Sequence, residues 1–84
     1  MPEISRFYGI VVKIYLMGKE HNPPHVHFIY GDRMSSYDIQ NLTLLEGDLP
    51  PKATSMCIEW LKIHKDELLE MWNSQNFRKL PPLE

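Results

Sequence analysis

The period of the hydrophobic pattern changes once along this chain, and that change restricts the fold more than any other feature. Up to about residue 46, apolar residues tend to alternate with polar ones, as they do in strands that bury one face. After the proline-rich segment 47–51, apolar residues recur at helical spacing. The sequence therefore predicts an α+β fold, in which an antiparallel sheet of three to four strands has one face covered by a long C-terminal helix.

Runs of β-branched and aromatic residues, separated by turn-forming residues, predict the strands. In the first run the even-numbered residues from Tyr8 to Leu16 are all apolar, so this face is expected to meet the core. The predicted strands span about residues 7–17, 25–30, 34–40 and 42–46.

The second half of the chain predicts one helix at about residues 51–73, followed by an extended tail at 77–84. Proline at the start fits the first helical turn, where no amide donor is needed. Most apolar residues, among them Trp60, fall on one broad stripe. Ile58 and Leu69 lie away from this stripe, so we expect a second contact to cover them.

Length and composition favour one small domain, residues 1–84, that gains stability by association. A chain of 84 residues buries too little surface for two cores, and a self-associated state would add to a small one. The formal charge of −2 gives no large positive field, which argues against tight, non-specific binding of nucleic acid.

Cys57 is the only cysteine, so no internal disulfide forms, and a reducing compartment fits best. The N-terminal residues lack the profile of a signal peptide, and no apolar run approaches the roughly 18 residues of a membrane span. We expect a cytoplasmic protein without membrane contact.

Four parts of the chain carry a resemblance to a known family. They are the first ten residues (Met-Pro-Glu-Ile-Ser-Arg-Phe-Tyr-Gly-Ile), His-Asn-Pro-Pro-His-Val-His at 21–27, Leu-Glu-Gly-Asp-Leu-Pro at 45–50, and the Glu-Trp and His-Lys-Asp-Glu-Leu-Leu segments of the predicted helix, with Trp72. Together these resemble the bacterial domain-of-unknown-function family numbered 4160. The resemblance implies no established activity. It does imply a gene setting beside another small gene, which suggests toxin–antitoxin-like pairs.

His21, His25 and His27 form a His-x3-His-x-His pattern. Two histidines at i and i+2 on a strand point the same way, and imidazoles are common ligands for divalent transition metals. No cysteine or suitably spaced acid completes a known zinc pattern, so we expect no cofactor and keep a metal at these three histidines as the alternative. His64 falls on the helix stripe, and we expect it to be a core histidine bonded to a backbone carbonyl.

The face of the sheet away from the helix is predicted to carry Lys13, His25, His27 and Asp38. Two histidines and a lysine suit acid, base and phosphate-stabilising roles in metal-free RNA cleavage, and Asp38 could orient one imidazole. The competing interpretation is that these residues belong to an ordinary half-solvated sheet face.

The sequence leads to a small protein-interaction module as the first hypothesis, with a second copy or a small neighbour-encoded protein as partner. Ile58 and Leu69 on the helix, with Tyr15 and Ile29 on the open sheet face, are the predicted contact residues. The alternative is a small RNA-cleaving or metal-dependent hydrolase that uses the open-face histidines. A regulator that binds nucleic acid is a third interpretation, which the negative charge disfavours.

Overall fold

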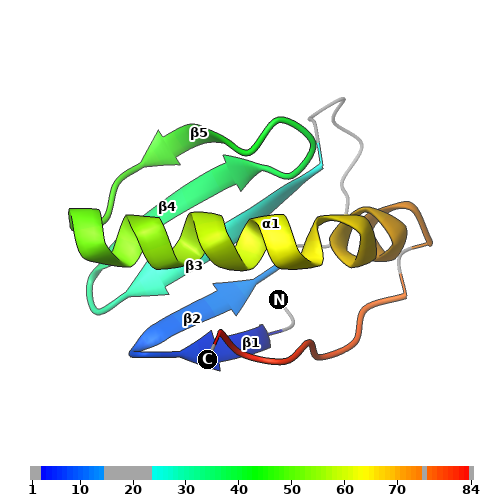
Figure 1. Cartoon of the computed structure of the whole chain (residues 1–84), viewed down its shortest axis with the longest axis horizontal. Coiled ribbons are helices and arrows are strands. Elements are labelled where there is room, and N and C mark those ends of the chain that lie inside the picture. The colour runs from blue at the N-terminus through cyan, green and yellow to red at the C-terminus, as the bar shows by residue number, and fades with distance from the viewer. Residues whose placement is uncertain (1–2, 15–23, 75, 84) are drawn as a thin grey trace.

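The computed structural model describes residues 3–14, 24–74 and 76–83. Five antiparallel strands form one sheet in which each strand pairs with the next along the chain, in the order β1-β2-β3-β4-β5. One helix lies across one face of this sheet (Figure 1). The elements are β1 (Glu3–Phe7), β2 (Ile10–Lys13), β3 (His25–Tyr30), β4 (Arg33–Asp38), β5 (Thr43–Gly47) and α1 (Pro51–Ser74).

The α+β class and the helix on one face agree with the sequence prediction, but the sheet has five strands instead of three to four. The prediction of one strand at about 7–17 is wrong, because the chain reverses at Tyr8 and Gly9. Their φ angles of 49° and 81° fit a two-residue turn of type I′, in which both central residues have positive φ. Gly9 inside an apolar run was the turn signal.

This turn also overturns the prediction that Tyr8 meets the core. Tyr8 is 62% exposed, whereas its neighbour Phe7 is buried. Side chains alternate between the two faces only within one strand, so the alternation begins anew in β2 after the turn. In β2, Ile10 and Val12 are buried as predicted. The last part of the predicted strand, 15–17, lies outside the described residues.

The predicted strand 25–30 coincides with β3, while the predicted strand 34–40 extends too far. β4 ends at Asp38, whose side-chain Oδ1 accepts hydrogen bonds from the backbone N–H groups of Gln40 (2.8 Å) and Asn41 (3.1 Å). Such an Asx-type turn competes with continued strand pairing. Leu42 follows with a positive φ of 58°, and β5 begins one residue later than predicted.

The helix agrees with the prediction to within one residue. Thr54 supports its first turn, because its backbone N–H donates to the carbonyl of Pro50 (2.9 Å) and its hydroxyl donates to the carbonyl of Leu49 (3.1 Å). Within the described residues, no helix combines the length and apolar character that crossing a membrane would require.

The helix departs from regular geometry at His64 (φ −108°, ψ 15°). This histidine is buried, as predicted. Its Nδ1 lies 2.7 Å from the Oε1 of Glu67. The predicted bond to a backbone carbonyl is therefore replaced by a carboxylate partner one helical turn further on, where a side chain at i+3 shares the same face.

Trp60 joins the layers of the core. It is fully buried, with its ring 5.9 Å from that of Phe7 in β1 and 6.2 Å from that of Phe28 in β3. Its indole N–H donates to the backbone carbonyl of Pro81 in the C-terminal tail (2.9 Å). A buried aromatic residue with its polar atom satisfied is a strong anchor for the contact between a helix and a sheet.

The C-terminal tail closes one edge of the sheet. Residues 76–83 have no regular secondary structure, and the chain runs back from the end of α1 toward β1 (Figure 1). The backbone N–H of Leu80 donates to the carbonyl of Ile4 (2.7 Å). β1 is thus paired with β2 on one side, and on the other it accepts this backbone hydrogen bond from the tail.

We predict that Gly47→Ala strongly destabilises the fold. Gly47 has a φ of 73°, and an added Cβ would clash with the backbone carbonyl of Met34 in the neighbouring strand. A strained φ together with a backbone clash should lower the free energy of unfolding by about 2–4 kcal/mol, measured by urea denaturation. The control is Gly31→Ala, where φ is 63° but no atom lies within 4 Å of the added Cβ. Equal losses in the two variants would contradict the steric explanation.

Candidate functional site

The strand register places the predicted catalytic side chains on one face of the sheet. Lys13 in β2 lies opposite His27 in β3, and His27 in turn lies opposite Ser36 in β4. His25 lies opposite Asp38 in the next row. Residues opposite one another on paired strands point to the same side. Since Val26 and Phe28 are buried in the core, strand parity assigns Lys13, His25, His27 and Asp38 to the opposite face, although the ring of His25, at the start of β3, reaches Trp72 of the core.

His25 and His27 contact each other. Their ring centroids are 5.2 Å apart in an edge-to-face arrangement, and the ring of His25 also lies 5.1 Å from that of Trp72 near the end of α1. His27 is only 8% exposed, and burial, helped by the nearby His25, lowers the pKa of His27 to about 4. The imidazole of His27 is therefore neutral at pH 7 and has the protonation state of a base.

The side chain of Asp38 hydrogen-bonds the turn that follows β4. In addition to the two bonds to Oδ1, its Oδ2 accepts a hydrogen bond from the side-chain amide of Asn41 (3.2 Å). Both carboxylate oxygens thus stabilise the turn after the strand. The role of Asp38 in orienting a histidine stays a prediction.

The predicted metal site cannot be built in full, because His21 lies outside the described residues. Among the residues that the structure does describe, no group of three His, Cys, Asp or Glu side chains is arranged to hold a metal ion. His25 and His27 alone supply two ligands, whereas a catalytic zinc site usually has three from the protein. The metal site at His21, His25 and His27 stays a prediction.

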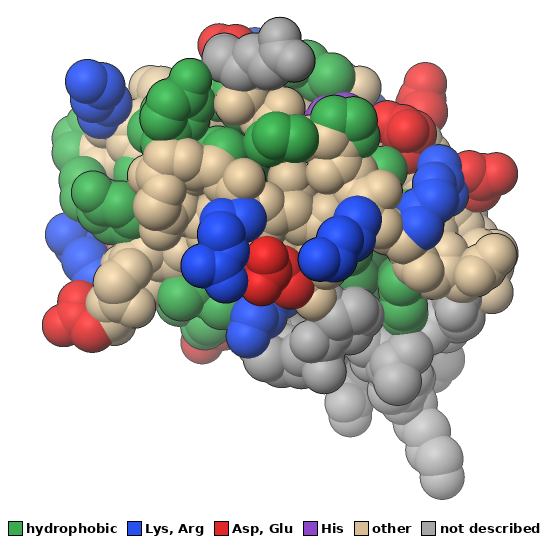
Figure 2. Space-filling model, turned by 90° about the horizontal axis from the view of Figure 1, so that it is seen from below, with side chains coloured by type: hydrophobic (Ala, Val, Ile, Leu, Met, Phe, Trp, Pro, Cys, Tyr) green, Lys and Arg blue, Asp and Glu red, His purple; other side chains and the backbone are tan. Residues whose placement is uncertain are grey.

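Lys13 belongs to a basic group at the β1 side of the sheet. Arg6 forms an ion pair with Glu3 (3.0 Å), and this hydrogen-bonded contact lowers the pKa of Glu3, with smaller contributions from Lys79 and Lys13. Figure 2 shows Lys and Arg side chains gathered across the surface on this side of the molecule. Three cations around one carboxylate leave a local positive surface on a chain of net charge −2.

The predicted contact residues differ in how much surface they offer. Ile58 and Leu69 are half-buried and pack against the core, so only part of each is available to a partner. Ile29 is half-buried on the face away from the helix, opposite Val11 and Met34. Tyr15 lies outside the described residues.

The edge strand β5 is a candidate contact surface that the sequence did not single out. Every residue of β5 is exposed, and Leu44 and Leu45 are 50% and 46% exposed. A bulge at this point of the β4–β5 pairing leaves Leu45 between the Tyr37–Leu44 and Ser36–Glu46 pairs. In a strand, two adjacent leucines point to opposite faces, so at least one would be expected to point into the core. The sequence therefore did not predict that both are exposed.

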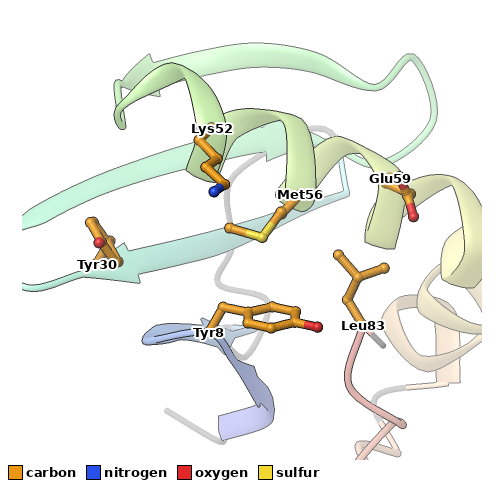
Figure 3. A pocket seen from close by; sticks show the side chains of 6 residues that line it. All are labelled: Tyr8, Tyr30, Lys52, Met56, Glu59 and Leu83. Atoms are coloured by element: carbon orange, nitrogen blue, oxygen red, sulfur yellow. The ribbon is translucent and has the colours of Figure 1, made fainter.

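A groove between α1 and the β1–β2 turn is a second surface that the sequence did not reveal. It has a volume of about 520 Å³, and Figure 3 shows Tyr8 below Met56, with Lys52 reaching toward the same space. The lining residues from α1 recur at helical spacing, but the two tyrosines come from distant parts of the chain, so the sequence pattern did not predict that they line one groove. The lining residues are Tyr8, Tyr30, Lys52, Met56, Glu59 and Leu83.

Comparison with known proteins identifies one family. A family model described as Domain of unknown function (DUF4160) matches residues 9–73, which is more than half of the chain. Neither the curated proteins nor the solved structures contain a match to this chain.

We predict that the stability of the fold decreases between about pH 7 and pH 5.5 because of His27. The pKa of His27 is lower in the folded state than the ordinary 6.5, so in this range the unfolded chain binds a proton that the folded chain does not. The free energy of unfolding should fall by about 1 kcal/mol from this residue.

Urea denaturation at the two pH values, with a metal chelator present, measures this effect. His27→Gln removes the titrating group and keeps the other three histidines, so it should show a smaller decrease than the wild type. The same decrease in both proteins would exclude His27 as its source.

Proposed function

Because this chain belongs to the DUF4160 family, whose function is unknown, we propose its function from its own residues: it is a small protein-interaction module. The observation that supports this proposal best is the difference between the two edges of the sheet. The β1 edge is covered by the C-terminal tail, whereas β5 is exposed along its whole length and presents Leu44 and Leu45. An exposed apolar edge strand is a template for a strand from another chain.

The proposed partner is an extended segment that adds to the sheet beside β5. Backbone hydrogen bonds would supply affinity, while apolar side chains would cover Leu44 and Leu45. Glu46 is the one charged residue of β5, so a basic side chain opposite it would favour binding. The family resemblance suggests a source for this segment, namely a small protein encoded by a neighbouring gene in a bacterial, toxin–antitoxin-like pair that acts in the cytoplasm.

We predict that Leu45→Lys abolishes capture of this partner. The side chain is about half exposed, so a lysine can be solvated without unfolding the domain, but its charge would be buried once a strand is added. The measurement is co-expression with the product of the adjacent gene, affinity purification and determination of the stoichiometry of the retained protein.

Ile63→Lys is the matched control, because Ile63 is a comparably exposed apolar residue on α1 instead of β5. It should retain the partner at the wild-type ratio. If the wild-type protein retains no adjacent gene product, or if Leu45→Lys retains it fully, the strand-addition proposal is wrong.

An RNA-cleaving enzyme is the second candidate function, and the contact between His25 and His27 favours it. His27 is uncharged at pH 7 and can accept a proton, although a pKa of about 4 makes it a weak base; His25 lies beside it, and Lys13 opposite His27 could stabilise a phosphate. The basic group around Glu3 continues from Lys13 and would attract the RNA backbone.

This candidate predicts that His25→Gln reduces cleavage of single-stranded RNA by about 100-fold or more. His25 is half-buried, so the domain should stay folded, which circular dichroism would check. His64→Gln, in the helix, serves as the control and should cleave at the wild-type rate. An unchanged rate for His25→Gln, or no cleavage by the purified wild-type protein, would reject the enzyme.

A further inference from the structure

Tyr8 is held at a positive φ by the type I′ turn between β1 and β2, a conformation that is unfavourable for a bulky side chain. A bulky residue at positive φ is strained by roughly 1–2 kcal/mol, and the first position of a type I′ turn favours asparagine. The ring is 62% exposed, so little of this strain is offset by burial. Strained, exposed residues of this kind tend to occur where another molecule binds.

On the side of the groove that α1 forms, a positive and a negative side chain lie at opposite ends of an apolar one. Lys52, Met56 and Glu59 lie at i, i+4 and i+7, so they share one side of α1, with the cation nearer the start of the helix and the acid further along. Lys52 and Glu59 are exposed and Met56 is half-buried. At 1.5 Å per residue the two charges are about 10 Å apart along the helix axis, with Met56 near their midpoint.

This charge arrangement is complementary to a second copy of itself that runs in the opposite direction. If a second helix of the same sequence lies antiparallel across it, Lys52 of each chain faces Glu59 of the other, and the two Met56 side chains meet at the centre. No like charges face each other in this arrangement. An isologous two-fold contact requires this reciprocity, in which residue i contacts residue j and j contacts i.

From these observations we infer that the groove is the contact surface for a second copy of this chain, related by a two-fold axis beside Met56. Two ion pairs between Lys52 and Glu59 fix the antiparallel direction. The ring of Tyr8, which lines the same groove beside Met56 (Figure 3), covers the apolar centre from each side. Burial of this ring between the copies would offset the cost of the positive φ that the turn imposes on Tyr8.

The self-association is separate from strand addition at β5. In Figure 1, α1 lies between β5 and the β1–β2 turn, so the groove and the edge strand are on opposite sides of the helix. One copy can therefore use both surfaces at the same time, and variants at one surface should leave the other intact.

Charge reversal with rescue tests this inference, read out by sedimentation equilibrium of the purified full chain over a range of concentrations. Lys52→Glu alone and Glu59→Lys alone each place like charges opposite one another twice, and each should raise the dimer dissociation constant by about tenfold or more. The double variant Lys52→Glu/Glu59→Lys restores both pairs and should return the constant to near the wild-type value. Lys62→Glu, with the same charge change at an exposed helix residue outside the groove lining, should leave it unchanged.

Tyr8→Asn gives a second readout, because it relieves the strain in the turn and removes the ring. It should raise the thermal unfolding temperature measured where the chain is monomeric and weaken the dimer in the same protein. A wild-type chain that stays monomeric at every concentration overturns the inference, as does a dimer that neither single reversal weakens. Single reversals that weaken the dimer without rescue by the double variant overturn the antiparallel geometry. Leu45→Lys should still dimerise, which separates this result from the fate of the β5 proposal.

Discussion

The contacts of Trp60 hold the parts of this small domain together. One side chain packs on Phe7 at the edge of the sheet and on Phe28 at its centre, and it also accounts for the position of the tail through its hydrogen bond to Pro81. Helix, sheet and tail therefore meet at a single residue. Other side chains of the helix, such as Leu61 and Leu68, are also buried in the core, but truncation of a buried tryptophan typically costs about 3–5 kcal/mol.

Much of the fold followed from local patterns in the sequence. β3 and α1 were predicted almost to the residue, because each has strong periodicity and clear boundary residues, such as Pro51 at the start of the helix. The first hairpin was missed because Tyr8 is an unusual turn residue and the apolar pattern continues through Gly9. The end of β4 was missed because it depends on the side chain of Asp38, which hydrogen-bonds the following turn, a choice that residue-type propensity does not reveal.

The sites were predictable only where they depend on strand parity. Alternation was sufficient to place Lys13, His25 and His27 on a common face, since the period of a strand is fixed. Exposure of β5 and the shape of the groove depend on which strand ends the sheet and on where the tail runs. Those are properties of the tertiary structure, and the contact between Trp60 and Pro81 that directs the tail joins residues 21 positions apart.

The hydrogen bond from Leu80 to Ile4 has a consequence for how far any assembly through strand pairing can grow. A sheet with two open edges can add copies at both ends and extend into a fibre, whereas here the tail occupies one of them. Joining at β5 would therefore end after a single addition and give a finite particle instead of a polymer. Removal of the tail would expose a second edge and turn a self-limiting module into a chain that is able to aggregate.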